Sequence, residues 1–142
     1  MEPLSTRHLG VGRVLSGLAA LFLLVDAAGK LFRLDPVVAG TVELGYPESS
    51  VVPIGLLLAA GVLLYAVPRT AVLGALYLTA YLGGAVATHV RVGSPLLSHT
   101  LFPIYVAAIL WAGLALRRPQ LLTVLLGNGR DGEAALGPRA DE

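Results

Sequence analysis

Four long apolar stretches separated by short polar segments constrain this chain more than any other feature. The clearest is Val51–Val67, which runs for 17 residues without a charged side chain. A helix rises about 1.5 Å per residue, so it needs roughly 20 residues to cross hydrocarbon about 30 Å thick. Charged residues make up only 13% of the chain, whereas a soluble domain carries about a quarter. We therefore expect an integral membrane protein with spans at 14–33, 51–67, 71–90 and 100–116.

Short turns between these stretches predict how the spans are connected. The turn VPRT (67–70) is too short to leave the membrane interface, so it makes the second and third spans an antiparallel hairpin. The loop 34–50 contains Asp35 as an N-cap, Pro36 in a first turn and Gly45 as a stop, which predicts a short surface helix. The predicted fold class is all-α, a transmembrane four-helix bundle with a short interfacial helix between the first and second spans.

The predicted membrane domain covers residues 1–118. Residues 119–142 are predicted to form a cytoplasmic tail that is partly disordered, although Gln120–Leu126 has the apolar character of a segment that rests on the membrane surface. The small residues of the third span, Gly74, Gly83 and Gly84, favour close approach of neighbouring helices in lipid.

Basic residues predict the orientation of the chain. The end that holds both termini carries seven of them: Arg7, Arg13, Arg69, Arg117, Arg118, Arg130 and Arg139. The other end carries three: Lys30, Arg33 and Arg91. The positive-inside rule therefore places both termini in the cytoplasm and the protein in the cell membrane.

A cleaved signal peptide is the alternative interpretation of the first span. Arg7 and Arg13 would be its basic head and Val14–Val25 its apolar core, with a cut after Ala28. Asp26 sits where such a cut requires a small residue, and three further spans follow. We therefore favour a retained span.

Polar residues interrupt two spans that run in the same direction. Asp26 and Lys30 lie near the outer end of the first span, and Thr88, His89 and Arg91 near the outer end of the third. His99 precedes the fourth span on the same side. A charge at a helix centre costs about 2.5–3.5 kcal/mol on insertion scales, and such groups usually face a protein interior. We therefore predict one buried polar site at the outer leaflet.

Helical geometry supports a shared face on the third span. At about 100° per residue, its polar residues fall within half of the helix circumference. They are Tyr77, Tyr81, Thr88, His89 and Arg91. Asp26 and His89 are the candidate catalytic residues, and Lys30, Tyr77, Tyr81, Thr88, Arg91 and His99 are candidate ligand-binding residues. The spacing of four between Asp26 and Lys30 also permits an ion pair along the helix.

Simpler roles remain open for several of these side chains. Lys30 and Arg91 have the length to reach the lipid headgroups and anchor their helices. His89 is equally compatible with a capping role, and His99 with an interfacial position on a turn. Tyr65, Tyr105 and Trp111 are interpreted as members of the interfacial aromatic belt.

Several classes of chemistry are not supported by the sequence. The chain has no cysteine, which excludes thiolate nucleophiles and cysteine-bound iron–sulfur clusters in this chain. Asp26, Glu43, His89 and His99 lack helical metal-ligand spacing, and a proline turn separates the two histidines, so we predict no metal site. The net charge is +1 with dispersed basic residues, which does not favour nucleic-acid binding.

The order of several short motifs resembles a known family. These motifs are DAAGK, LGYP, PRTA, TAYLGGAVATH, R-x-G-x-P and H-x-LFP, and they extend over about Val14 to Leu116. They are similar to the DoxX-like family of small four-span bacterial membrane proteins. The resemblance implies a four-helix membrane bundle. It also implies a redox association, because the group is named after a subunit linked to thiosulfate oxidation with quinone as acceptor, and other members resemble partners of redox and oxidative-stress proteins. The lack of cysteine argues against direct sulfur chemistry in this chain.

Three functions follow as hypotheses. The first is a redox- or quinone-associated membrane protein in which His89 or Tyr81 binds a quinone and Asp26 exchanges protons. The second is a cofactor-free enzyme, of isomerase or epoxide-opening type, that acts on an apolar molecule. The third is a noncatalytic subunit. The expected partners are the lipid bilayer, a membrane or redox protein, and a second copy of the chain in a homo-oligomer.

Overall fold

The protein is an all-α helical bundle, as predicted. The computed structural model describes residues 6–125, so the predicted tail after Leu125 lies outside the described residues. Its helices are α1 (Thr6–Leu31), α2 (Asp35–Glu43), α3 (Val51–Ala66), α4 (Ala71–Arg91), α5 (Phe102–Arg117) and α6 (Gln120–Leu125). Two short turns precede α3 and α5: the 3-10 turn η1 (Glu48–Ser50) and the π-helical turn η2 (Leu96–Thr100).

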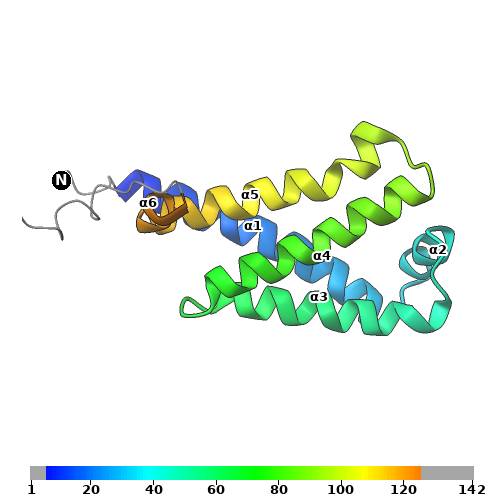
Figure 1. Ribbon diagram of the computed structural model, residues 1–142. Coiled ribbons are helices and arrows are strands. Elements are labelled where there is room, and N and C mark those ends of the chain that lie inside the picture. The colour runs from blue at the N-terminus through cyan, green and yellow to red at the C-terminus, as the bar shows by residue number, and fades with distance from the viewer. Residues whose placement is uncertain (1–5, 126–142) are drawn as a thin grey trace, which may run out of the picture.

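The four long helices pack in a ring around a common core. Helix α1 contacts α3 and α5, and α4 also contacts α3 and α5. Helices α2 and η2 lie at one end of the ring, which we call the loop end (Figure 1). The start of α1, the turn between α3 and α4, and α6 lie at the opposite end, which we call the terminal end. The polar residues of α1 and α4 therefore occupy the same end of the bundle.

All four predicted spans are present, and the first, second and fourth begin earlier than predicted. Together with their preceding turns, the helices Arg7–Leu31, Glu48–Ala66, Ala71–Arg91 and Leu96–Arg117 are long and apolar enough to cross a membrane. The first helix begins at Thr6, earlier than predicted, because its first turns pack on α5 at Gly12. A Cβ atom at Gly12 would lie 2.9 Å from the Cβ atom of Leu116.

The surface helix α2 also has the predicted form. Pro36 lies in its first turn, but its cap residue is Leu34 and Asp35 is already helical. Gly45 follows the helix with a φ of +85°, a left-handed conformation that glycine adopts without strain. The prediction that Asp35 caps the helix was therefore wrong by one residue.

Small residues bring the helices close together, as predicted for Gly74 but not for Gly83 and Gly84, where an added Cβ atom would have no neighbour within 4 Å. A Cβ atom at Gly74 would lie 2.2 Å from the backbone nitrogen of Tyr65, so α3 and α4 nearly touch along their backbones. A Cβ atom at Gly113 would lie 2.7 Å from the backbone nitrogen of Ser16, which shows the same approach between α1 and α5. Such contacts replace the hydrophobic driving force that lipid does not supply.

The outer faces of the helices are apolar. Leu18, Leu63 and Val90 have exposed fractions of 58%, 64% and 64%. Large exposed aliphatic side chains around every long helix would be unfavourable in water but match the hydrocarbon of a bilayer. The outer surface therefore supports an integral membrane protein.

Tyr65 corrects one prediction. It was interpreted as an interfacial belt residue, but it is only 1% exposed. Its hydroxyl donates to the carbonyl oxygen of Leu110 at 2.8 Å and lies 2.9 Å from the Ser16 hydroxyl. These partners satisfy a phenol that would otherwise be costly to bury. Tyr65 is thus a core residue at the terminal end, whereas Tyr105 is 45% exposed.

Candidate functional site

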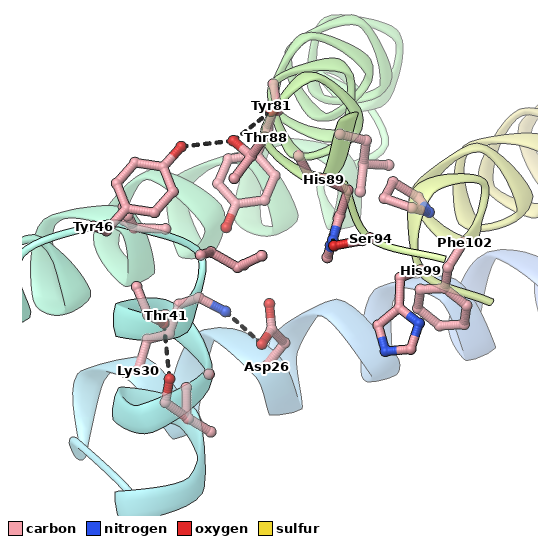
Figure 2. Close-up of a pocket in the computed structure, with 18 of the residues that line it drawn as sticks. Asp26, Lys30, Thr41, Tyr46, Tyr81, Thr88, His89, Ser94, His99 and Phe102 are labelled. Carbon is pink, nitrogen blue, oxygen red and sulfur yellow. Dashed lines mark hydrogen bonds and ion pairs between the residues drawn. The ribbon is translucent and has the colours of Figure 1, made fainter. Parts of the chain in front are cut away.

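A half-open cavity of about 950 Å³ lies at the loop end. Helices α1, α2, α4 and α5 and the η2 turn all contribute to its wall. The polar side chains that line it are Asp26, Lys30, Thr41, Glu43, Tyr46, Tyr81, Thr88, His89, Ser94 and His99. Figure 2 shows most of them arranged around one space. Six of the eight residues predicted to form a site thus line the same cavity.

Asp26 and Lys30 form an ion pair on the α1 wall. The Lys30 Nζ atom lies 2.5 Å from an Asp26 carboxylate oxygen, one helical turn away (Figure 2). The Lys30 side chain is 13% exposed and the Asp26 side chain 36% exposed. Lys30 therefore points back into the protein and does not extend to the headgroups. Asp26 is the more accessible member of the pair from the cavity.

The close approach of α3 explains why Lys30 is covered. A Cβ atom at Gly55 would lie 2.8 Å from the Cβ atom of Lys30 and 3.3 Å from the carbonyl oxygen of Ala27. A larger residue at position 55 would push α3 away and uncover the lysine. The geometry of the ion pair thus depends on a glycine in the neighbouring helix.

Two histidines lie together on the opposite side of the cavity. The His89 and His99 rings have centroids 6.0 Å apart and planes at 64°. The Nδ1 atom of His89 lies 3.0 Å from the Ser94 hydroxyl, and that of His99 lies 2.7 Å from the Ser98 hydroxyl. Each ring is therefore held through its Nδ1 atom, and no residue within 6–125 forms a hydrogen bond with either Nε2 atom.

The η2 turn makes this arrangement possible. His99 belongs to a π-helical turn that begins after Pro95, and π-helical turns occur frequently at functional sites. Thr100 is buried in the same turn and donates a hydrogen bond to the Ser94 carbonyl oxygen at 3.2 Å. Within residues 6–125 no group of three or more acidic or histidine side chains is placed to hold a metal ion.

Tyr46 is a cavity residue that the sequence analysis did not select. The Thr88 hydroxyl donates to the Gly84 carbonyl oxygen at 2.9 Å, as expected for a threonine inside a helix. That hydroxyl has only one proton, so it accepts its second hydrogen bond from the Tyr46 hydroxyl, 2.8 Å away (Figure 2). This contact attaches the loop after α2 to α4.

Arg91 lies outside the cavity and holds the same loop from another side. Its guanidinium donates to the carbonyl oxygen of Leu44 at 2.6 Å. The guanidinium also lies 3.1 Å from where a Cβ atom of Gly45 would be. Arg91 therefore supplies a partner for a carbonyl oxygen at the C-terminus of α2, where cations are favoured. The structure does not bring it together with Asp26 and His89 in the cavity wall.

Tyr77 and Tyr81 both lie on α4 but face different surroundings. Tyr81 is half-buried and lines the cavity. Tyr77, one turn earlier, packs against α3, where a Cβ atom at Gly61 would lie 2.6 Å from its ring. Tyr81 thus belongs to the candidate site and Tyr77 to a helix contact.

Aromatic and aliphatic side chains complete the cavity wall. Phe22 of α1 and Phe102 of α5 meet edge to face, with ring centroids 5.4 Å apart and planes at 68°. Leu23, Leu82 and Val106 add to this surface. The cavity therefore has an apolar wall, formed by residues of α1, α4 and α5, and a polar wall around the ends of α1 and α4. Such a division suits a ligand that has an apolar body and a few polar atoms.

Comparison with known proteins identifies the family. No curated protein and no solved structure matches the chain significantly. Residues 14–113 match the DoxX-like family, and these residues contain α2 to α4 and most of α1 and α5. The match covers most of the chain and agrees with the resemblance of its sequence motifs. The protein is a member of the DoxX-like family.

Proposed function

We propose that the loop-end cavity binds a lipophilic ring compound of the quinone class. The observation that carries this proposal is the cavity itself, which combines about 950 Å³ of space with one apolar wall and one polar wall. Ligand pockets commonly have volumes of about 300–1,000 Å³ with a few placed polar groups. The exposed apolar helices around it would let such a ligand enter from the bilayer.

The residues present fit a quinone ring. Its carbonyl oxygens are acceptors, so they need hydrogen-bond donors in an otherwise apolar wall. Tyr81 and His89 supply such donors from α4. Phe22 and Phe102 supply aromatic surface on the other side of the cavity. Tyr46 and Thr88 close the rim above this space and hold the loop in place.

Asp26 and Lys30 supply the groups for proton exchange. A bound quinone would contribute two-electron chemistry, in which its conversion to the quinol consumes two protons. A carboxylate beside an ammonium group can pass a proton to or from a neighbouring ligand, which is the role of a general acid–base pair. The electrons are assigned to a membrane or redox partner protein, as the association of the family with redox proteins suggests.

Quinone affinity of matched variants tests this proposal. The purified protein in detergent would be titrated with a short-chain benzoquinone in equilibrium dialysis. Tyr81→Phe and His89→Ala should each weaken binding about tenfold, because a hydrogen bond to a buried acceptor contributes about 1 kcal/mol or more. Tyr77→Phe and His8→Ala are the controls, since neither residue lines the cavity, and they should leave binding unchanged.

Two results would overturn the proposal. The first is the absence of saturable quinone binding to the unaltered protein. The second is an equal loss of affinity in Tyr81→Phe and Tyr77→Phe, because the loss would then not depend on a hydroxyl that lines the cavity.

We infer that the loop end faces outward and the terminal end faces the cytoplasm of the cell. Arg7, Arg13, Arg69, Arg117 and Arg118 belong to the terminal end, which the positive-inside rule places in the cytoplasm. The chain has no cysteine, so single replacements give an unambiguous test. Ser98→Cys should react with an impermeant maleimide on intact cells, and Thr123→Cys should react only after lysis. The reverse pattern would invert the orientation.

A further inference from the structure

The terminal end contains a second, smaller cavity that the proposed function does not use. It has a volume of about 210 Å³ and lies between α1, α3 and α5. Arg13, Ser16, Tyr65 and Arg117 are its polar lining residues. Two cations therefore converge on a single small cavity at the end of the bundle opposite to the quinone-type site.

Arg117 has an unusual environment for a cation. Its side chain leaves the last turn of α5 and crosses α1, where a Cβ atom at Gly12 would lie 3.0 Å from its Cγ atom. Its guanidinium carbon then lies 5.5 Å from the centroid of the Tyr65 ring. The guanidinium is thus positioned by three helices and by a cation–π contact.

Two of its nitrogens are shielded from solvent without an acceptor. Within residues 6–125, neither Nε nor Nη2 of Arg117 has a hydrogen-bond partner. These two atoms form one edge of the planar guanidinium, the edge that binds a carboxylate or phosphate through two parallel hydrogen bonds. A buried charged donor without an acceptor is costly, so the site favours an anion that supplies one.

Arg118 provides the contrast. Its guanidinium donates to the carbonyl oxygen of Pro68, in the turn between α3 and α4. It does not line the small cavity. The two adjacent arginines thus differ in their partners: Arg118 has a protein acceptor, whereas Arg117 has an aromatic ring and an empty volume.

We propose that the Arg13–Arg117 cavity binds the phosphate group of an acidic phospholipid. Arg117 ends the fourth span, which places its guanidinium near the level of the lipid headgroups. Basic pockets between transmembrane helices are known sites for acidic headgroups. The Nε–Nη2 edge of Arg117 would take two phosphate oxygens, and Arg13 would balance the remaining charge. The lipid would then bridge α1, α3 and α5 at their terminal ends.

Native mass spectrometry of the full-length protein tests this site. The protein would be released from micelles with phosphatidylglycerol or phosphatidylcholine, and the bound fraction measured at each lipid concentration. Phosphatidylglycerol should bind at least about tenfold more tightly, and Arg117→Gln should abolish that preference. Arg118→Gln is the matched control, since it removes the same charge one residue away, and should keep most of the preference.

A conservative variant protects the test against a folding defect. Arg117→Lys keeps the positive charge but loses the two-pronged edge, so it should bind phosphatidylglycerol with intermediate affinity. Equal effects of Arg117→Gln and Arg118→Gln would overturn the proposal, because general surface charge would then explain lipid binding. Displacement of the lipid by an equal concentration of inorganic phosphate would also overturn the lipid assignment, since the site would then hold a free anion.

Discussion

The two ends of this bundle differ in how closely their polar side chains are packed. At the terminal end, the Tyr65 hydroxyl is buried between helices and bonded to Ser16 and Leu110. At the loop end, Asp26, Lys30 and His89 line a half-open cavity of about 950 Å³. The same four helices thus hold the Tyr65 hydroxyl in direct contact with its partners beside a cavity of only about 210 Å³, and hold the loop-end polar groups around a much larger space. The Tyr65 hydroxyl thus stabilises the fold, whereas the loop-end groups are available to a ligand.

The glycines of this bundle differ in how closely they are packed. Gly74 and Gly113 bring backbones together near the terminal end, whereas a Cβ atom added at Gly83 or Gly84 of α4 would have no neighbour within 4 Å. Helix α4 is therefore uncovered at Gly83 and Gly84, between Tyr81 and the buried Thr88. Glycine residues thus allow close packing at Gly74, Gly113 and Gly55 and leave free surface at Gly83 and Gly84.

The largest expected effect separates these two kinds of glycine. Gly74→Ala should destabilise the protein by about 3 kcal/mol, because its Cβ atom would lie 2.2 Å from the backbone of Tyr65 and the helices must move apart. Gly83→Ala is the matched control and should be neutral or stabilising by up to about 1 kcal/mol, from helix propensity alone. Reversible unfolding in mixed detergent and dodecyl sulfate micelles measures both. Similar losses in the two variants would contradict the difference in packing.

The next effect compares the two hydrogen-bonded tyrosines. Tyr65→Phe should cost about 2 kcal/mol, because it removes two buried hydrogen bonds, to the Ser16 hydroxyl and to the Leu110 carbonyl oxygen. Tyr46→Phe should cost less than about 1 kcal/mol, because Tyr46 is only half-buried and Thr88 keeps its bond to Gly84. The same unfolding assay compares them. A larger loss for Tyr46→Phe than for Tyr65→Phe would contradict the conclusion that the Tyr65 hydrogen bonds stabilise the fold more.

The smallest effect concerns the loop above the cavity. Arg91→Ala removes the donor to the Leu44 carbonyl oxygen and should lower global stability by less than about 1 kcal/mol. It should nevertheless speed amide hydrogen exchange in α2, because the loop loses one of its two attachments to α4. Arg69→Ala, in the turn at the terminal end, is the control. Unchanged exchange in α2 would show that Tyr46 alone holds this loop.

Much of the fold could be predicted from local features of the sequence. The lengths of the apolar stretches predicted the four spans, and Pro36 and Gly45 predicted the limits of the helix between the first two spans. Both predictions depend only on residues that are close together in the sequence. The direction of the spans also placed Asp26 and His89 at the same end, and both residues line the loop-end cavity. These inferences needed only helix length and the number of membrane crossings.

The remaining details depend on contacts between distant segments. Tyr46 and Thr88 are 42 residues apart, so no sequence pattern indicated their hydrogen bond. Tyr77 and Arg91 share the polar side of α4 with His89. Tyr77 packs against α3, however, and Arg91 donates to the loop after α2, so neither side chain lines the cavity. Tyr65 was wrongly predicted as an interfacial residue, because its hydrogen-bond partners, Ser16 and Leu110, lie on two other helices and cannot be identified from the sequence around Tyr65. Contacts with other helices therefore determine where each of these side chains lies.

Photo-crosslinking with a quinone that carries an azide on its ring tests the central claim most directly. We expect light-dependent adducts on the α1 segment around Asp26 and on the α4 segment from Tyr81 to His89, and we expect excess unlabelled quinone to suppress them. Peptide mass spectrometry locates the adducts. Adducts confined to lipid-facing positions such as Leu63, or adducts that excess quinone does not reduce, would contradict a ligand site in the loop-end cavity.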